Sequence, residues 1–143
     1  MIFIMRGIPG SGKSYHAKTL TKRVHYIVSA DQCFVDNDGV YRFDHTKIGE
    51  AHQGCFRSFI RLAQQFDVDV VVDNTNIRLW ELSPYVLAGE AHGHAVELVH
   101  VRCDVEKAIA RNTHGVPEVV IRRMAEQFEA PLPHWTQRMI END

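Results

Sequence analysis

Cysteine is scarce in this sequence, and no set of metal ligands stands out. The 143 residues contain three widely spaced cysteines, Cys33, Cys55 and Cys103. An odd number of scattered cysteines indicates neither a disulfide framework nor a paired-cysteine zinc site. We therefore expect the three cysteines to act as small hydrophobic side chains, in a protein that works in a reducing, intracellular setting. His92 and His94 flank a glycine but lack the further convergent ligands that zinc requires.

Long hydrophobic runs are also missing. The first apolar run, residues 2–5, is interrupted at Arg6, which is too early for a signal peptide. No later run approaches the ~18 residues that a membrane span requires. We therefore expect a soluble, cytoplasmic protein without a membrane partner.

Neither sign of charge is in excess. Sixteen Lys and Arg residues oppose eighteen Asp and Glu residues, which gives a formal net charge of -2. A long, non-specific nucleic-acid groove takes its affinity from many basic residues, so this balance argues against one. It still allows a short basic patch beside a pocket that binds the end of a nucleic-acid chain. The candidates for this patch are Arg57, Arg61, Arg122 and Arg123.

What is present fits an ordinary globular domain. The composition is 45% hydrophobic and 24% charged, without internal repeats, low-complexity tracts or linkers. A chain of this length buries roughly 65–70% of its extended surface on folding, so a hydrophobic core can form without disulfides or structural metals. We expect one domain that covers residues 1–143.

Strand and helix patterns alternate along the chain. Short apolar or β-branched runs predict strands, and apolar residues at steps of three or four predict helices between them. The expected strands are 2–5, 26–28, 68–72 and 95–101, and the expected helices are 13–22, 47–66, 79–91, 105–111 and 118–129. This order predicts an α/β fold with a four-stranded parallel sheet flanked by helices, whose ligands bind at the carboxyl edge of the strands.

Two local details accompany this pattern. Residues 36–39, DNDG, are a turn signal, and we expect an exposed hairpin or loop there, with Tyr41 and Phe43 beyond the turn. Within the helix 79–91, Pro84 is expected near the first turn, with Ser83 as the cap.

The first strand leads directly into a glycine-rich motif. Residues 7–14, GIPGSGKS, match the P-loop pattern G-x-x-x-x-G-K-[ST] at every fixed position. Glycines allow backbone N–H groups to turn inward around a phosphate, Lys13 then reaches the β- and γ-phosphates, and the Ser14 hydroxyl ligates Mg²⁺. The expected nucleotide-binding residues are Gly10, Ser11, Gly12, Lys13, Ser14 and Tyr15; the structural alternative is an incidental glycine turn.

Two carboxylates end predicted strands and therefore face the same sheet edge as this loop. Asp73 closes a run of valines, where it is expected to act as the Walker B carboxylate and to bind Mg²⁺ with Ser14. Asp31 follows the strand 26–28, where it can accept the proton of a substrate hydroxyl that attacks the γ-phosphate. For each aspartate, the structural alternative is a cap or turn that bonds nearby backbone.

Further polar residues are candidates for substrate binding. Asn74 and Asn76 follow Asp73 and either hold the loop or contact the substrate. His52 and Arg57 lie on the helix 47–66, which can line the substrate pocket, although an ordinary surface role suits His52 equally well.

A basic segment near the end of the chain is a candidate lid. Arg111 precedes the loop 112–117, and a guanidinium there would stabilise negative charge on the transferring phosphate while closure excludes water. Arg122 and Arg123 either join this lid or form a solvated basic face.

Together these residues resemble the polynucleotide 5′-hydroxyl kinase-like branch of the P-loop kinases, which includes the bacteriophage polynucleotide kinase domain and related eukaryotic kinase-like domains. The resemblance extends from Met5 to about Phe128. Its most specific segments outside the P-loop are residues 29–31 (SAD), 50–52 (EAH), 72–76 (VDNTN), 110–112 (ARN) and 114–116 (HGV). The phage kinase has an arginine three residues after its base, where this chain has Phe34.

The resemblance implies a kinase-like P-loop NTPase fold with a small helical lid, with ATP and Mg²⁺ at the P-loop and a tunnel-like site for a 5′-hydroxyl end. It assigns Lys13 and Ser14 to the phosphates and the metal. It also makes Asp31 the general base and Asp73 the Walker B residue, and it puts Arg111 in the lid.

The sequence therefore predicts an ATP-dependent kinase that acts on the 5′-hydroxyl end of an RNA or DNA oligonucleotide, with Lys13, Asp31 and Arg111 as catalytic residues. One alternative is a small-molecule kinase for a nucleoside or a sugar, which suits the near-neutral charge. Another is an ATP-binding module that hydrolyses ATP slowly and switches a partner's contacts. The choice between RNA and DNA and the oligomeric state are left open.

Overall fold

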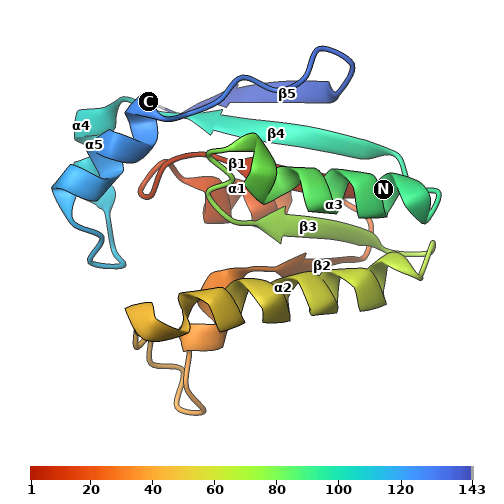
Figure 1. Ribbon diagram of the computed structural model, residues 1–143, viewed down its shortest axis with the longest axis horizontal. Helices are drawn as coiled ribbons and strands as arrows, with labels where there is room; N and C mark the ends of the chain where they lie inside the picture. Colours follow the sequence, from red (N-terminus) through yellow and green to blue (C-terminus); the bar gives the residue numbers. More distant parts are fainter. Residues whose placement is uncertain (143) are drawn as a thin grey trace.

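The apolar runs of the sequence form one parallel sheet (Figure 1). The computed structural model describes residues 1–142. The strands are β1 (Ile2–Arg6), β2 (His25–Val28), β3 (Asp69–Asp73), β4 (Val96–Arg102) and β5 (Thr136–Glu141). Their order across the sheet is β2-β3-β1-β4-β5, and every neighbouring pair is parallel. The predicted α/β class is confirmed.

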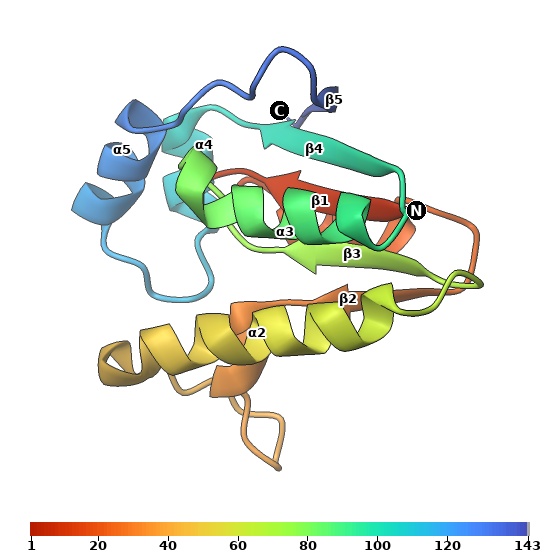
Figure 2. The ribbon, with the colours of Figure 1, turned by 45° about the vertical axis from the view of Figure 1, so that its right-hand side comes forward.

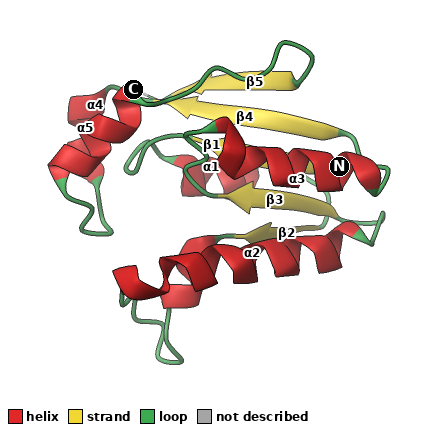
Figure 3. Cartoon of the chain, viewed as in Figure 1, coloured by secondary structure: helices red, strands yellow, loops and turns green. Residues whose placement is uncertain are grey.

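Helices cover both faces of this sheet (Figure 3). They are α1 (Lys13–Thr19), α2 (Ile48–Ala63), α3 (Leu79–Ala91), α4 (Val105–Arg111) and α5 (Glu118–Glu126), with short 3₁₀ helices η1 (Ala30–Phe34) and η2 (His45–Lys47). Within residues 1–142, no helix has the length and apolar character that a membrane span requires.

The central strand β1 is buried on both faces. Its side chains alternate, so Ile2 and Ile4 belong to the core beneath α2 and α3, while Phe3 and Met5 pack in the core beneath α1. The carboxyl ends of the strands meet at one edge, on the left of Figure 1, where the P-loop, η1 and the α4–α5 pair also gather.

The predicted number of strands was wrong by one, because β5 adds a fifth strand beside β4. Its sequence, TQRMIE, has no apolar run, and most of its side chains are exposed. The backbone ladder to β4 and an ion pair from Arg138 to Glu97, with a 2.6 Å nitrogen–oxygen distance, hold it in place. A polar edge strand carries little of the hydrophobic pattern from which strands are predicted.

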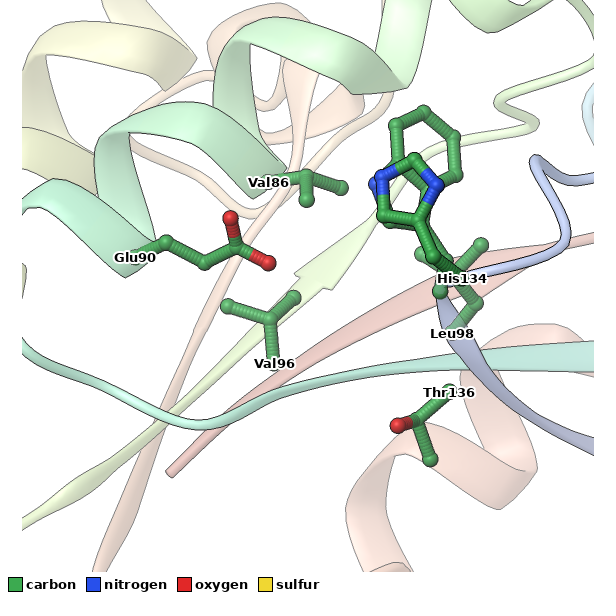
Figure 4. A pocket seen from close by; sticks show the side chains of 7 residues that line it. Val86, Glu90, Val96, Leu98, His134 and Thr136 are labelled. Carbon is green, nitrogen blue, oxygen red and sulfur yellow. The ribbon is translucent and has the colours of Figure 1, made fainter.

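The segment that leads into β5 also covers the core. Trp135 packs against the cluster beneath α3. Figure 4 shows His134 and Thr136 from this segment around a cavity of about 50 Å³, with Val86 of α3 and Leu98 of β4 on its walls.

The predicted bounds of α3, residues 79–91, are confirmed, but its predicted cap is wrong. The helix begins at Leu79, so Pro84 lies inside it and Ser83 is not its cap. Instead, the backbone N–H of Arg78 donates to Glu81 at 2.8 Å in a capping box. The predicted exposed hairpin is confirmed by a single antiparallel bridge between Val35 and Tyr41.

Candidate active site

The P-loop joins β1 to α1 and depends on two glycines in the left-handed region. The φ angles of Gly10 and Gly12 are 82° and 96°, which side-chain-bearing residues rarely adopt. A Cβ atom on Gly10 would also collide with the backbone carbonyl of Ala108 in α4. At the start of the loop, a Cβ on Gly7 would lie 3.1 Å from Cγ of Lys13, so the first part of the lysine side chain packs beside Gly7.

A hydroxyl and a carboxylate meet beside this loop. Ser14 Oγ donates a 2.8 Å hydrogen bond to Oδ2 of Asp73, the last residue of β3. Asp73 is buried, and its Oδ1 atom has no hydrogen-bond partner within residues 1–142. This pair of hard oxygen ligands, with one buried oxygen unsatisfied, fits Mg²⁺.

The part of the chain that the structure describes contains no group of three or more His, Cys, Asp and Glu side chains placed to hold a metal. His92 Nδ1 and His94 Nε2 instead lie 2.8 and 2.7 Å from the carbonyl oxygens of Ala88 and Ala63. A magnesium ion at Ser14 and Asp73 would therefore complete its octahedron with water and nucleotide phosphates, the usual arrangement for Mg²⁺ in phosphotransfer sites.

Asp31 lies at the same edge, in the first turn of η1, which follows β2. The cap of this turn is Ser29, whose Oγ accepts from the Asp31 backbone N–H at 3.1 Å. The Asp31 carboxylate is therefore not needed as the cap, and its side chain is 53% exposed. An exposed carboxylate at the strand edge is accessible to an acceptor hydroxyl.

Two aromatic side chains flank the Asp31 carboxylate. Tyr41 Oη donates to Oδ1 at 3.4 Å, and His114 Nδ1 lies 3.6 Å from Oδ2. The two rings stack on each other at 4.6 Å. Burial, and then the negative charge of Asp31, raise the pKa of Tyr41 to about 12, so the phenol keeps its proton.

Through these contacts the candidate lid, the loop 112–117, covers one side of the Asp31 carboxylate. His114 lies in the loop between α4 and α5, which Figure 2 shows reaching from these helices toward η1 and the start of α2. Sequence reasoning did not assign Tyr41 or His114 to the site, because no local pattern indicates a contact between segments so far apart in the chain. Phe34, which occupies the position of the phage arginine, is buried and packs near Phe43 with ring centroids 5.1 Å apart.

The two asparagines after Asp73 make contacts within the protein. Asn74 Oδ1 accepts from the backbone N–H of Ala30 at 2.9 Å, which ties the end of β3 to the residue before Asp31. Asn76 is buried, adopts a φ of 48° and donates from Nδ2 to the carbonyl of Met5 at 2.8 Å. These bonds position the loop around the site, and a direct contact with substrate stays a prediction.

A buried arginine anchors the lid helices to the sheet. Arg6, at the end of β1, donates from Nε to the Asn76 carbonyl at 2.8 Å and from a terminal nitrogen to the Glu129 carbonyl at 2.7 Å. Its guanidinium also lies over the ring of Phe128, 4.4 Å from the centroid. Burial lowers the pKa of Arg6 to about 10, so the side chain remains charged near neutral pH.

The other predicted basic residues lie on the surface. Arg111 ends α4 and is exposed. Arg122 forms ion pairs with Glu118 and Glu106 at 2.7 and 2.8 Å, which favours the solvated-face interpretation for this residue.

The remaining predicted contacts are also exposed. Tyr15, on α1 directly after the P-loop, has 69% of its surface accessible. His52 and Arg57 lie on the outer side of α2. Arg57 is about 14 Å along the axis from the first residue of that helix, at 1.5 Å per residue, whereas His52 is close to the end of α2 that lies at the site edge.

A parallel sheet whose first strand runs into a G-x-x-x-x-G-K-S loop and a helix defines a P-loop NTPase fold of the kinase-like type. A family model described as "AAA domain" matches residues 2–131. The chain belongs to this family.

A curated relative is the human NEDD4-binding protein 2, which is 33% identical over 135 residues. The match covers 90% of this chain and 8% of the relative. The chain thus spans less than a tenth of the length of this curated relative.

Solved structures agree on the fold. Kti12 from Chaetomium thermophilum, in complex with ADP-AlF3, superposes with a TM-score of 0.66 at 13% identity, covering 99% of this chain and 88% of that one. A chain of the Pnkp1/Rnl/Hen1 complex superposes with a TM-score of 0.64 at 22% identity, covering 81% and 40%. At these identities the likeness is one of fold.

Proposed function

We propose that this protein is an ATP-dependent kinase that transfers the γ-phosphoryl group to the 5′-hydroxyl end of RNA or DNA. The observation that carries the proposal is a pair of carboxylates on neighbouring strands with different surroundings. Asp73 on β3 is buried and bonded to the P-loop residue Ser14. Asp31, after β2, is exposed and lies beneath the lid loop. An ATP-binding switch needs the first carboxylate, whereas a kinase also needs the second.

The nucleotide half of the site uses the P-loop. Backbone N–H groups of residues 10–12 cradle the phosphates of ATP, and the Lys13 ammonium neutralises the β- and γ-phosphates. Mg²⁺, held by Ser14 and through water by Asp73, would supply positive charge to the phosphate oxygens. Tyr15 is exposed beside this loop and contacts the nucleotide. The complex of Kti12 with ADP-AlF3 supports nucleotide binding by the shared fold.

The acceptor half of the site uses Asp31. Its carboxylate orients the acceptor hydroxyl and takes its proton as the oxygen forms a bond to the γ-phosphorus. The bond from that phosphorus to the bridging oxygen breaks, and ADP leaves. Arg111 in the lid stabilises the charge on the equatorial oxygens.

The polynucleotide acceptor is supported by the sequence segments around Asp31, Asp73 and the lid, which resemble the polynucleotide 5′-hydroxyl kinase-like branch. His52, near the end of α2 at the site edge, is the proposed contact of the acceptor, with Arg57 further along the same helix. Asn74 and Asn76 hold the loop around the acceptor pocket through their bonds to Ala30 and Met5. A kinase for a nucleoside or sugar would use the same phosphate and base residues, so the acceptor has to be tested directly.

Transfer of label from γ-labelled ATP to a panel of acceptors tests this proposal. The panel contains a 5′-hydroxyl oligonucleotide of RNA, one of DNA, a mononucleoside, a sugar and a reaction without acceptor. We expect label on the oligonucleotides. If only the small acceptors are labelled, the proposal is wrong and the protein is a small-molecule kinase. If ATP is hydrolysed at the same rate with every acceptor and without any, the protein is an ATPase module.

A further inference from the structure

The end of β5 contacts the P-loop directly. Asn142 follows the strand, and its backbone N–H continues the ladder by donating to the carbonyl of Arg102 at 2.8 Å. Its side-chain Nδ2 donates to the backbone carbonyl of Ser11 at 2.7 Å. The two bonded residues are 131 positions apart, and Asn142 lies outside the part of the chain that the family model matches.

This bond fixes the orientation of one peptide unit of the P-loop. The carbonyl of Ser11 and the N–H of Gly12 belong to the same planar unit, and in a trans peptide they point in opposite directions. All peptide bonds in the described chain are trans. Because Asn142 holds the carbonyl on one side, the Gly12 N–H is directed to the other side, away from β5.

The contact between Asn142 and the P-loop also depends on the absence of a side chain at Gly12. A Cβ atom built on Gly12 would overlap the amide nitrogen of Asn142. The asparagine amide therefore packs directly on the backbone of Gly12, where any side chain would displace it. The absence of a side chain at Gly12 thus serves both the left-handed backbone and the contact with β5.

We propose that Asn142 is a positioning residue for nucleotide binding, which holds the Ser11–Gly12 peptide so that the Gly12 N–H faces the phosphates of ATP. This inference rests on the proposed use of the P-loop for ATP. Because coupling between two sites is reciprocal, bound nucleotide also stabilises the attachment of β5. Neither the P-loop motif nor the family match contains this residue.

The variants Asn142→Ala and Asn142→Asp test this role. Loss of one peptide-directed hydrogen bond weakens ATP binding by about 3- to 10-fold in Asn142→Ala. In Asn142→Asp the effect is larger, because a carboxylate of similar shape cannot donate and brings negative charge toward the carbonyl of Ser11. The dissociation constant of ATP is measured by calorimetry, together with the KM of the oligonucleotide acceptor, which should not change, and the melting temperature without nucleotide.

Glu141→Gln is the matched control. It removes the 3.2 Å ion pair between Glu141 and Arg102, which also ties β5 to β4, but leaves the P-loop contact intact. We expect it to bind ATP as the wild type does. Wild-type affinity in Asn142→Ala, or equal weakening in Glu141→Gln, overturns the inference while the kinase proposal stands. A wild-type protein that does not bind ATP overturns both.

Discussion

Asp31 and Asp73 show how surroundings divide the work between two identical side chains. Asp73 is only 8% exposed and accepts a hydrogen bond from the P-loop residue Ser14. Asp31 is 53% exposed beside Tyr41 and His114, so its carboxylate is accessible from solvent. In the proposed function, this contrast separates the nucleotide half of the site from the acceptor half.

In the proposed function, Lys13 belongs to the nucleotide half of the site. Because charge-assisted bonds to phosphate are among the stronger ones, we expect Lys13→Ala to raise the dissociation constant of ATP by at least about tenfold and to lower turnover as well. Equilibrium binding and steady-state kinetics measure the two effects. Lys18→Ala, on the exposed side of the same helix, should leave both unchanged. Normal binding and turnover in Lys13→Ala would remove the P-loop from the mechanism.

At the scale of elements, the α4–α5 pair is fastened to the sheet by a partly buried stack. Phe128 follows α5, and its ring contacts both the Arg6 guanidinium at the end of β1 and the His100 ring on β4, which stacks on it with a 4.2 Å centroid distance. Burial, followed by the charges of Arg6 and Arg102, lowers the pKa of His100 to about 4. The imidazole is therefore neutral in the folded protein near neutral pH.

This stack predicts an acid-sensitive contribution to stability. A histidine of the unfolded chain has a pKa near ~6.5, so protons favour the unfolded state as the pH falls from that value toward about 4. When the pH falls from 7.5 to 4.5, the free energy of unfolding should therefore decrease less in His100→Phe than in the wild type. The two decreases should differ by roughly 2 kcal/mol. Urea unfolding at each pH measures this difference.

His45→Gln is the control for that measurement, because His45 is exposed on η2. It should follow the wild-type pH dependence. If His100→Phe also follows the wild type, protonation of His100 does not contribute to acid destabilisation.

Most elements could be predicted from the sequence because their apolar residues repeat with the period of a strand or a helix. The valines of β3 and the apolar face of α2 are examples. β5 could not, because its exposed edge position requires few apolar residues and the backbone ladder to β4 holds it. The cap of α3 was wrongly assigned to Ser83, because the capping box at Arg78 and Glu81 already starts the helix at Leu79 and leaves Pro84 in its interior.

In the candidate site, too, features with a local sequence pattern could be predicted and contacts between distant segments could not. The position of the P-loop, Asp31 and Asp73 at the carboxyl edge of the sheet could be predicted, because the P-loop and Asp31 come soon after β1 and β2 and Asp73 ends β3. Their roles stay predictions. The contacts of Tyr41 with His114 and of Asn142 with Ser11 depend on how distant segments meet in three dimensions. No pattern within a short window of sequence encodes them.

At the scale of the whole molecule, the parallel sheet brings the P-loop, the two carboxylates and the lid to one edge (Figure 1). In the proposed function, nucleotide and acceptor would therefore meet across the ends of β1, β2 and β3. The central claim is that this edge transfers a phosphoryl group to a hydroxyl oriented by Asp31. Nucleotide binding alone does not require Asp31, which makes this residue the point at which a kinase differs from an ATP-binding module.

Substitution of Asp31 therefore tests the claim most directly. The measurement compares wild type, Asp31→Asn and the exposed hairpin variant Asp38→Asn for transfer of label from ATP to a 5′-hydroxyl oligonucleotide, with the dissociation constant of ATP determined for each. The account predicts that Asp31→Asn lowers transfer by at least about 100-fold with ATP affinity nearly unchanged, and that Asp38→Asn transfers normally. Near-wild-type transfer by Asp31→Asn would contradict it.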